Sequence, residues 1–293
     1  MTGKQRLAIG LVCGVAILGG AAWADTNATR FGGATVSAVA QEERGIDALL
    51  RATRLESLVH VVATEGARHG LGLEASLFPG RGGVAWGRVV SSIQAPERLV
   101  PVLTETIRGE LGADELAAAS IFFASALGRK VAAREVEARR AMLDADVEAE
   151  AMAAVALPDP TDDRAALVDE VIETLDLVGA NVSGGLNANY AFYRGLGDGG
   201  ALARRLTERE MLAMVWGQEP EVRASMTRWL TAYLSRAYAP LSDQELRDYI
   251  AFLGTKAGRR WSAALFAGFG RVFEETSYEL GLAAARFIAM EDA

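Results

Sequence analysis

The chain has 293 residues, of which 51% are hydrophobic, and its 30 basic and 38 acidic residues give a net charge of −8. Nucleic acid attracts basic surfaces, so this acidic balance excludes nucleic acid as the expected partner. The apolar content is sufficient for a sizeable core, in one large domain or in two of ordinary size.

The N-terminus has the three-part layout of a secretory signal peptide, which we assign to residues 1–24. Lys4 and Arg6 precede the apolar run Leu7–Ala21, and Ala22-Trp23-Ala24 offers small residues at a cleavage point. We expect cleavage after Ala24 and a periplasmic or secreted mature protein. The open alternative is an uncleaved anchor, although the apolar run is short for a bilayer.

Cleavage removes the single cysteine, Cys13, so the mature chain has neither a disulfide nor a thiol nucleophile. It also removes Lys4 and Arg6, which leaves 28 basic against 38 acidic residues and a charge near −10. No later segment is long and apolar enough to span a membrane. Residues 25–45 are polar and lack a period, which predicts a flexible leader.

From Ile46 onwards the apolar residues recur at helical spacing, and no stretch alternates strictly. We therefore predict an all-α, multi-helix bundle with no β-sheet. Two closely spaced prolines make residues 157–161 a linker, because they forbid a continuous helix. The linker separates helical repeat one, residues 46–156, from helical repeat two, residues 162–293. Thr161 is the predicted cap of a helix that continues through Val178.

The two halves carry related motifs, FFASALGRKV from Phe122 and FLGTKAGRRW from Phe252. Four identities share one offset of 130 positions: Glu115 with Glu245, Phe122 with Phe252, Gly128 with Gly258, and Arg129 with Arg259. A period this long predicts two tandem homologous halves rather than a solenoid. They form either separate domains or one interdigitated bundle. A second match, Glu56 with Glu173, has an offset of only 117 and implies a net insertion of about thirteen residues between Gly195 and Met226.

The glycines of the second motif predict a break between two helices. Ser242 and Glu245 have the spacing of a capping box, which starts one helix. Gly254 suits its end, and Thr255 suits the cap of the next helix. Gly258 then falls in a first turn, where the absence of a side chain permits close approach to a neighbour.

These motifs resemble those of bacterial secreted proteins grouped as domain-of-unknown-function family 2059, whose pattern is an acidic lead-in, a helix ending in Phe, a Ser/Thr-Pro-x-Gly step and a long helix. The matching positions are Glu115, Phe122, Phe123, Ser125, Gly128 and Arg129 in one half, and Glu245, Phe252, Leu253, Thr255, Gly258 and Arg259 in the other. Both copies depart from the pattern after the Ser/Thr, where Ala126 and Lys256 replace the proline. The resemblance implies a helical extracytoplasmic domain and supplies no catalytic residue.

Two sets of residues are candidates for binding. Cations in a first helical turn oppose the helix dipole, so Arg129, Lys130, Arg259 and Arg260 are candidate contacts for a phosphate or lipid headgroup; the alternative is pairing with Glu245, Asp248 or Glu115, or exposure to water. Small and amide residues at 179–189 indicate either close helix packing or a ligand groove. The candidate groove residues are Asn181, Tyr190, Phe192, Tyr193 and Trp216.

No catalytic or metal-binding constellation is evident. His60 and His69 lie nine positions apart, which places them on roughly opposite faces of a helix. No serine lies in a G-x-S-x-G elbow, and the glycine-rich residues 195–200 fit a turn better than a phosphate loop. We therefore predict no enzymatic activity, no cofactor and no metal.

Two functions remain. The favoured one is a non-enzymatic periplasmic role in protein interaction or envelope association, with an unknown protein partner. The alternative is a carrier that encloses an apolar ligand, such as a lipid or an isoprenoid, between the two halves. An exposed apolar patch favours the first, a closed cavity between the halves favours the second, and buried carboxylates beside His60 would indicate a hydrolase.

Overall fold

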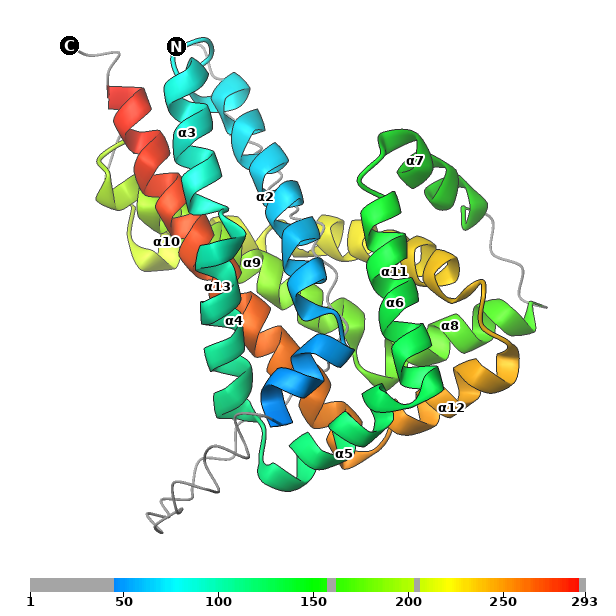
Figure 1. Cartoon of the computed structure of the whole chain (residues 1–293). Helices are drawn as coiled ribbons and strands as arrows, with labels where there is room; N and C mark the ends of the chain where they lie inside the picture. Colours follow the sequence, from blue (N-terminus) through cyan, green and yellow to red (C-terminus); the bar gives the residue numbers. More distant parts are fainter. Residues whose placement is uncertain (1–44, 157–161, 203–205, 290–293) are drawn as a thin grey trace, which may run out of the picture.

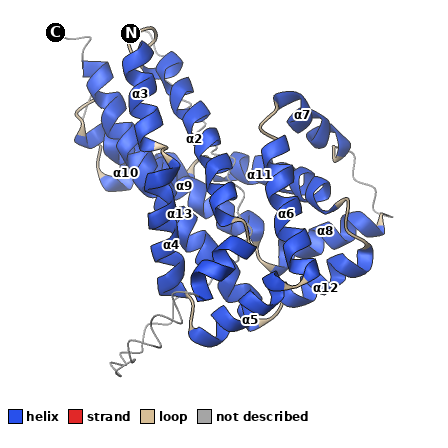
Figure 2. Ribbon diagram, in the orientation of Figure 1, coloured by secondary structure: helices blue, strands red, loops and turns tan. Residues whose placement is uncertain are grey.

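The computed structural model describes residues 45–156, 162–202 and 206–289, and this part of the chain contains helices and connecting turns but no strand (Figure 2). The all-α prediction is confirmed. The signal peptide, the leader up to residue 44 and the linker at 157–161 lie outside the described residues.

The helices of the first half begin with a short one at residues 45–52. The others are α2 (Leu55–Leu77), α3 (Gly83–Ile93), α4 (Pro96–Glu110), α5 (Ala113–Ala124), α6 (Ala126–Ala141) and α7 (Ala145–Ala154). Pro96 starts α4, since a proline at the first helical position loses no hydrogen bond.

The second half has a closely similar order of helices. They are α8 (Asp163–Thr174), α9 (Leu177–Asp198), α10 (Glu208–Trp216), α11 (Glu219–Tyr238), α12 (Asp243–Leu253) and α13 (Lys256–Ala289). The main difference is at the end, where the long α13 takes the place of the shorter α6 and α7. In Figure 1 α13 runs diagonally through the molecule, with α4 and α9 beside it.

Both halves contain a helix break that the apolar spacing did not predict. The expected helices through Val62 and Val178 are each interrupted, at Arg54 (φ 54°) and Asp176 (φ 45°). These residues are left-handed and directly precede α2 and α9. A left-handed non-glycine residue costs about 1–2 kcal/mol. Asp176 offsets part of this cost by capping α9, where its Oδ1 accepts from Gly179 N at 3.3 Å, whereas Arg54 makes no side-chain cap and depends on packing.

The position of this break changes the alignment of the two halves that the pairing of Glu56 with Glu173 had suggested. Glu56 lies in the first turn of α2, whereas Glu173 lies in the last turn of α8, so these two residues do not occupy equivalent places. The left-handed residues that precede α2 and α9 are instead 122 positions apart. The inserted length implied by that spacing is about eight residues rather than thirteen.

The predicted helix boundaries around the second motif are confirmed. Ser242 and Glu245 form a reciprocal capping box, with Glu245 N donating to Ser242 Oγ at 3.2 Å. Helix α12 ends before Gly254, and Thr255 Oγ1 accepts a hydrogen bond from Gly258 N at 3.0 Å. One expectation differs: the cap of α8 is Asp162, and Thr161 lies outside the described residues.

The motif glycines permit a tight step from one helix to the next. A Cβ on Gly258 would lie 2.2 Å from the carbonyl oxygen of Phe252, and a Cβ on Gly128 would lie 2.2 Å from that of Phe122. The neighbour approached in each case is the end of the preceding helix. Both turns therefore need glycine for the same steric reason.

The two motifs also pack against each other. The rings of Phe122 and Phe252 stack with centroids 3.8 Å apart. Lys130 pairs with Glu245 at 2.7 Å, and Lys256 pairs with Glu115 at 2.5 Å, so each half supplies a cation to the other. Exposed pairs of this kind contribute little energy but fix the register of the contact.

The halves form one interdigitated bundle rather than two separate cores. Trp261, Leu265 and Phe269 from α13 complete a core built mainly by helices of the first half. The other core joins Phe78, Trp86 and Val90 of the first half to residues of α8, α9, α11, α12 and α13. The apolar face of α13 is buried in these two cores.

Close packing between α9 and α13 occurs later in the chain than predicted. A Cβ on Gly195 would lie 2.2 Å from Tyr278 O, and one on Gly281 would lie 2.2 Å from Phe192 O. Gly184 and Gly185, inside the predicted stretch, have open space. Gly195 is therefore helical and serves this contact, which corrects the turn predicted at residues 195–200.

Within the described residues, no single helix is long and apolar enough to cross a membrane. Helices α5 and α6 reach the required length and composition only as a pair, and that pair is bent by 83°.

Candidate functional site

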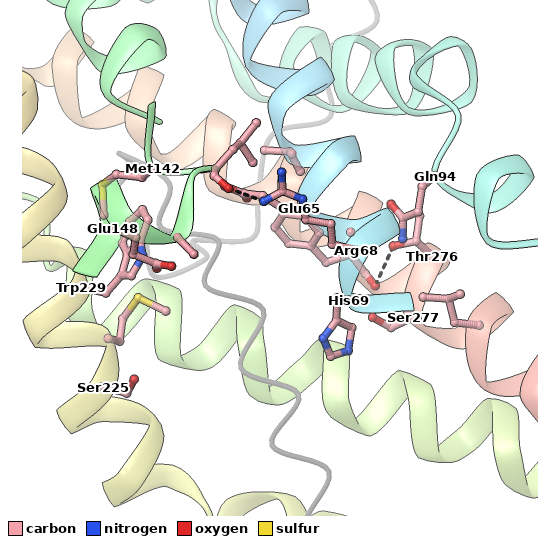
Figure 3. A pocket seen from close by; sticks show the side chains of 17 residues that line it. Glu65, Arg68, His69, Gln94, Met142, Glu148, Ser225, Trp229, Thr276 and Ser277 are labelled. Carbon is pink, nitrogen blue, oxygen red and sulfur yellow. Dashed lines mark hydrogen bonds between the residues drawn. The ribbon is translucent and has the colours of Figure 1, made fainter. Parts of the chain in front are cut away.

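A cavity of about 450 Å³ lies between the two halves. The first half contributes residues from α2, the end of α3, the turn between α6 and α7, and α7. The second half contributes residues from α11 and α13. Figure 3 shows side chains from these elements directed towards one space. The site therefore depends on packing between segments that are far apart in the sequence.

One end of the cavity contains a buried ion pair. Arg139 Nε donates to Glu65 Oε1 at 2.8 Å, and Arg139 Nη2 donates to Glu65 Oε2 at 2.6 Å. The arginine side chain is only 1% exposed, and its guanidinium carbon lies 4.5 Å from the ring centre of Trp229. The ring of Trp229 is oriented by Glu148, whose Oε1 accepts from the indole Nε1 at 2.9 Å. Each of these charged groups thus has a hydrogen-bond partner within the protein.

The other end of the cavity has uncharged polar groups. Gln94 and Ser277 are 8% and 4% exposed, and neither side chain has a hydrogen-bond partner in the part of the chain that the structure describes. His69 also lines the cavity, and its Nε2 is buried without a partner there. Burial lowers the pKa of His69, so its imidazole is neutral at pH 7.

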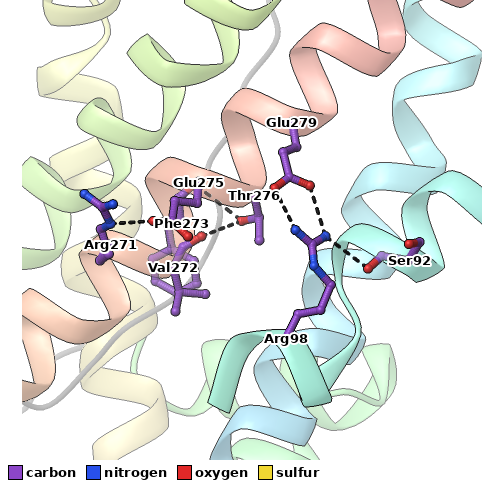
Figure 4. Close-up of polar contacts among 8 residues, drawn as sticks. All are labelled: Ser92, Arg98, Arg271, Val272, Phe273, Glu275, Thr276 and Glu279. Atoms are coloured by element: carbon purple, nitrogen blue, oxygen red, sulfur yellow. Dashed lines mark hydrogen bonds and ion pairs between the residues drawn. The ribbon is translucent and has the colours of Figure 1, made fainter. Parts of the chain in front are cut away.

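A bidentate ion pair fixes this polar end. Arg98, at the start of α4, donates to the two carboxylate oxygens of Glu279 on α13 at 3.0 and 2.8 Å, and it also donates to Ser92 O (Figure 4). The turn that carries Gln94 is therefore tied to the helix that carries Ser277. The hydrogen bonds that Arg98 donates to Glu279 raise the pKa of Arg98, which keeps the guanidinium charged.

The mouth of the cavity is crossed by a link between α2 and the turn before α7. The guanidinium of the exposed Arg68 donates to the carbonyl oxygen of Leu143. Both residues line the cavity. Arg68 is exposed and Leu143 is half-buried, so this link lies near the surface.

The chemistry of this cavity is that of binding. Apolar side chains and the edge of Trp229 form one wall, and the neutral groups of Gln94, Ser277 and His69 offer hydrogen bonds. No group of three His, Cys, Asp or Glu side chains within the described ranges could hold a metal ion. His60 is exposed on α2 and lies outside the residues that line the cavity.

The predicted groove residues do not share one groove. Asn181 is buried and donates to Leu177 O at 2.7 Å, while Phe192 and Tyr193 are buried in the core. Trp216 is 53% exposed on α10. Only Tyr190 lines a surface hollow, between α9 and α13, where its hydroxyl donates to Glu208 Oε1 at 3.2 Å.

The predicted anion contacts are engaged with groups of the protein. Arg129 donates to Ala124 O and Arg259 donates to Gly254 O, each at the end of the preceding helix. Arg260 donates to Glu110 O at 3.0 Å, and Lys130 pairs with Glu245 as described above. The structure does not bring the four cations together around a common anion, and it favours the alternative of internal pairing.

Sequence reasoning missed most of the cavity. Glu65 and Arg139 are 74 positions apart, so no local spacing connects them. Gln94 ends a helix and Ser277 lies inside one, and neither position has a motif. Of the polar residues that line the cavity, only His69 was considered from the sequence, as one of two histidines on a predicted helix.

Comparisons with known proteins found no relative of this chain. No protein-family model matches the chain, and neither a curated protein nor a solved structure matches it. The resemblance to the bacterial secreted family therefore rests on the two motif copies alone.

Proposed function

We propose that this protein is a non-enzymatic periplasmic binding protein that holds a small, largely apolar molecule in the cavity between its two halves. The observation that carries the proposal is the cavity itself, which is lined from both halves and contains the buried Nε2 of His69, an atom without a partner within the described residues. Its volume of about 450 Å³ falls in the range of roughly 300–1,000 Å³ that is usual for small-molecule sites.

The cavity favours the carrier hypothesis over the interaction role. A mostly apolar lining with a few polar groups is the usual composition of a small-molecule site. The polar end argues against a wholly hydrocarbon ligand, because such a ligand would leave Gln94 and Ser277 unpaired. The periplasmic location is part of the proposal, and it rests on the signal peptide assigned to residues 1–24.

The first test is native mass spectrometry of the protein purified from its own cells without denaturant. We expect a small molecule that is released on denaturation. We also expect the mass of the denatured polypeptide to be that of a chain starting at Asp25. A matched pair of variants on α11 adds specificity: Ser225→Trp fills the cavity and should abolish the bound mass, whereas Thr227→Trp, at an exposed position, should retain it. The same bound mass in both variants would overturn the proposed site.

A second candidate function is protein interaction through α10. Leu212, Met214 and Trp216 on this helix are 36%, 42% and 53% exposed. Exposed apolar side chains gathered on one helix are typical of a contact surface. A stoichiometric protein complex without a small ligand in the same mass spectra would support this role. We also propose the relationship to the secreted family 2059, which has no assigned activity.

A further inference from the structure

Two largely buried polar side chains can find hydrogen-bond partners only in the cavity. Gln94 and Ser277 are 8% and 4% exposed, line the cavity and make no side-chain hydrogen bond within the described residues. Beside them, Nε2 of His69 is fully buried without a partner in that part of the chain. Buried amides, hydroxyls and imidazoles in native proteins are nearly always satisfied by protein, water or ligand. The contents of the cavity, water or a ligand, therefore supply these hydrogen bonds.

These groups converge on one stretch of α2. Gln94 lies across Gly66, where an added Cβ would be 2.5 Å from Gln94 Oε1. His69 is one turn further along α2, and Leu280, one turn beyond Ser277, approaches the next turn at Gly70. An amide and a hydroxyl can each donate and accept a hydrogen bond. The polar end is therefore matched to a ligand group that has a donor beside an acceptor.

The polar end of the cavity offers no charge to an ionic ligand. Among the charged residues that line the cavity, Glu65 is paired with Arg139, Glu148 accepts from Trp229, and the guanidinium of Arg68 donates to a backbone carbonyl. An ion held by Gln94 and Ser277 would lose its hydration without gaining an opposite charge from either side chain, which is unfavourable in a largely buried place. The neutral imidazole of His69 supplies no charge either.

We propose that the ligand is an uncharged molecule that carries an amide-like donor and acceptor pair, held by Gln94 and Ser277, next to an apolar portion. The apolar portion lies along the wall formed by Met142, Met226 and Phe273. This inference rests on the proposed function, since it names the chemistry of the molecule that the same cavity takes.

The test uses probes of equal chain length and different charge. Hexanamide, hexanoate and hexylammonium are titrated at pH 7 into the mature full-length protein, with toluene as an apolar probe, and binding is followed by ligand-observed NMR. We expect hexanamide to bind about tenfold more tightly than either ion. Equal or tighter binding of an ion, or binding of toluene alone, overturns this inference and leaves the proposed function standing. Failure of all four probes overturns both.

Variants separate ligand recognition from packing. Gln94→Met keeps the size of the side chain and removes its amide, and Ser277→Ala removes the hydroxyl. Each should weaken hexanamide binding about five- to tenfold and leave toluene binding unchanged. The thermal midpoint should stay the same or rise, because no hydrogen bond within the protein is lost. A lower midpoint with unchanged affinity would assign the residue to packing and overturn the inference. Gln244→Met, at an exposed site on α12, is the matched control and should change neither measurement.

Discussion

The rings of Phe122 and Phe252 lie face to face, with centroids 3.8 Å apart and planes within 2°. The two residues hold the same place in the two motifs, and the charged residues around them contact each other reciprocally across the halves. Lys130 of the first motif reaches Glu245 of the second, and Lys256 of the second reaches Glu115 of the first. Such a contact, in which like surfaces meet, is the arrangement of a two-fold interface. It supports the hypothesis that the halves are tandem copies that pack as a pair.

The stacked phenylalanines should contribute strongly to stability. Replacing Phe252 by alanine removes this stack and the edge contact with Phe123 at 5.6 Å, so we expect unfolding to become easier by about 2–3 kcal/mol. Urea denaturation monitored by circular dichroism measures the change. Ile121→Ala is the control, because Ile121 is 75% exposed on the same helix as Phe122 and should shift stability by less than about 0.5 kcal/mol. Equal losses in both variants would contradict the stack as a stabilising contact.

Glycine at the motif turn should be irreplaceable even by alanine. Gly258→Ala places a Cβ 2.2 Å from Phe252 O and 2.7 Å from Leu253 Cα, and backbone atoms cannot move aside cheaply. We expect a loss of about 2–3 kcal/mol. Gly184→Ala on α9 has open space and should instead stabilise by about 0.5–1 kcal/mol, since alanine favours helix. Thermal midpoints of the two variants that move in the same direction would refute this steric account.

The features that sequence predicted well are those specified by local chemistry. The capping box at Ser242 and the cap at Thr255 each depend on a few neighbouring residues, and both are confirmed. The all-α class follows from the helical period of the apolar residues. These signals do not depend on where the rest of the chain lies.

The features that sequence missed are those specified by tertiary packing. The break at Arg54 occurs without a glycine, a proline or a side-chain cap, so nothing local marks it. The break at Asp176 does have a local signal, because aspartate is a common N-cap and this side chain caps α9. Gln94 and Ser277 belong to different halves and line the same cavity because α13 packs beside α2 and α3. A cavity is a gap left by such packing, and a pattern of single residues does not encode its position.

A buried carboxyl group provides a test by pH. Glu135 Oε1 accepts hydrogen bonds from the hydroxyls of Tyr238 and Tyr249 at 2.8 and 3.1 Å. Burial raises the pKa of Glu135 to about 7, against the effect of these two hydrogen bonds, which lower it. In the unfolded chain the pKa of this group is near 4.5. The folded protein therefore binds this proton more tightly than the unfolded chain does.

The sign of the pH dependence follows from that difference. The stabilisation from Glu135 is fully present below about pH 4.5 and is lost as the pH rises through 7. We expect this group to lower the free energy of unfolding by roughly 2 kcal/mol between pH 5 and 8. In Glu135→Gln that decrease in the free energy of unfolding should disappear. Urea midpoints of the parent and the variant, measured between pH 5 and 8, test this difference. Parallel pH curves for the variant and the parent would exclude the proton on Glu135 as the cause.

The ion pair between Glu65 and Arg139 should stabilise the cavity only while both partners are present. Arg139→Met leaves the Glu65 carboxylate in a largely buried place without its counter-charge, and it removes the contact with Trp229. We expect a loss of about 3 kcal/mol. In Glu65→Leu combined with Arg139→Met, no charge of the pair remains, so most of that stability should return. Urea unfolding of the two single variants and the double variant forms a thermodynamic cycle. A double variant as unstable as the sum of the singles would show that the two side chains act independently, and the cavity would then be held by packing rather than by its charges.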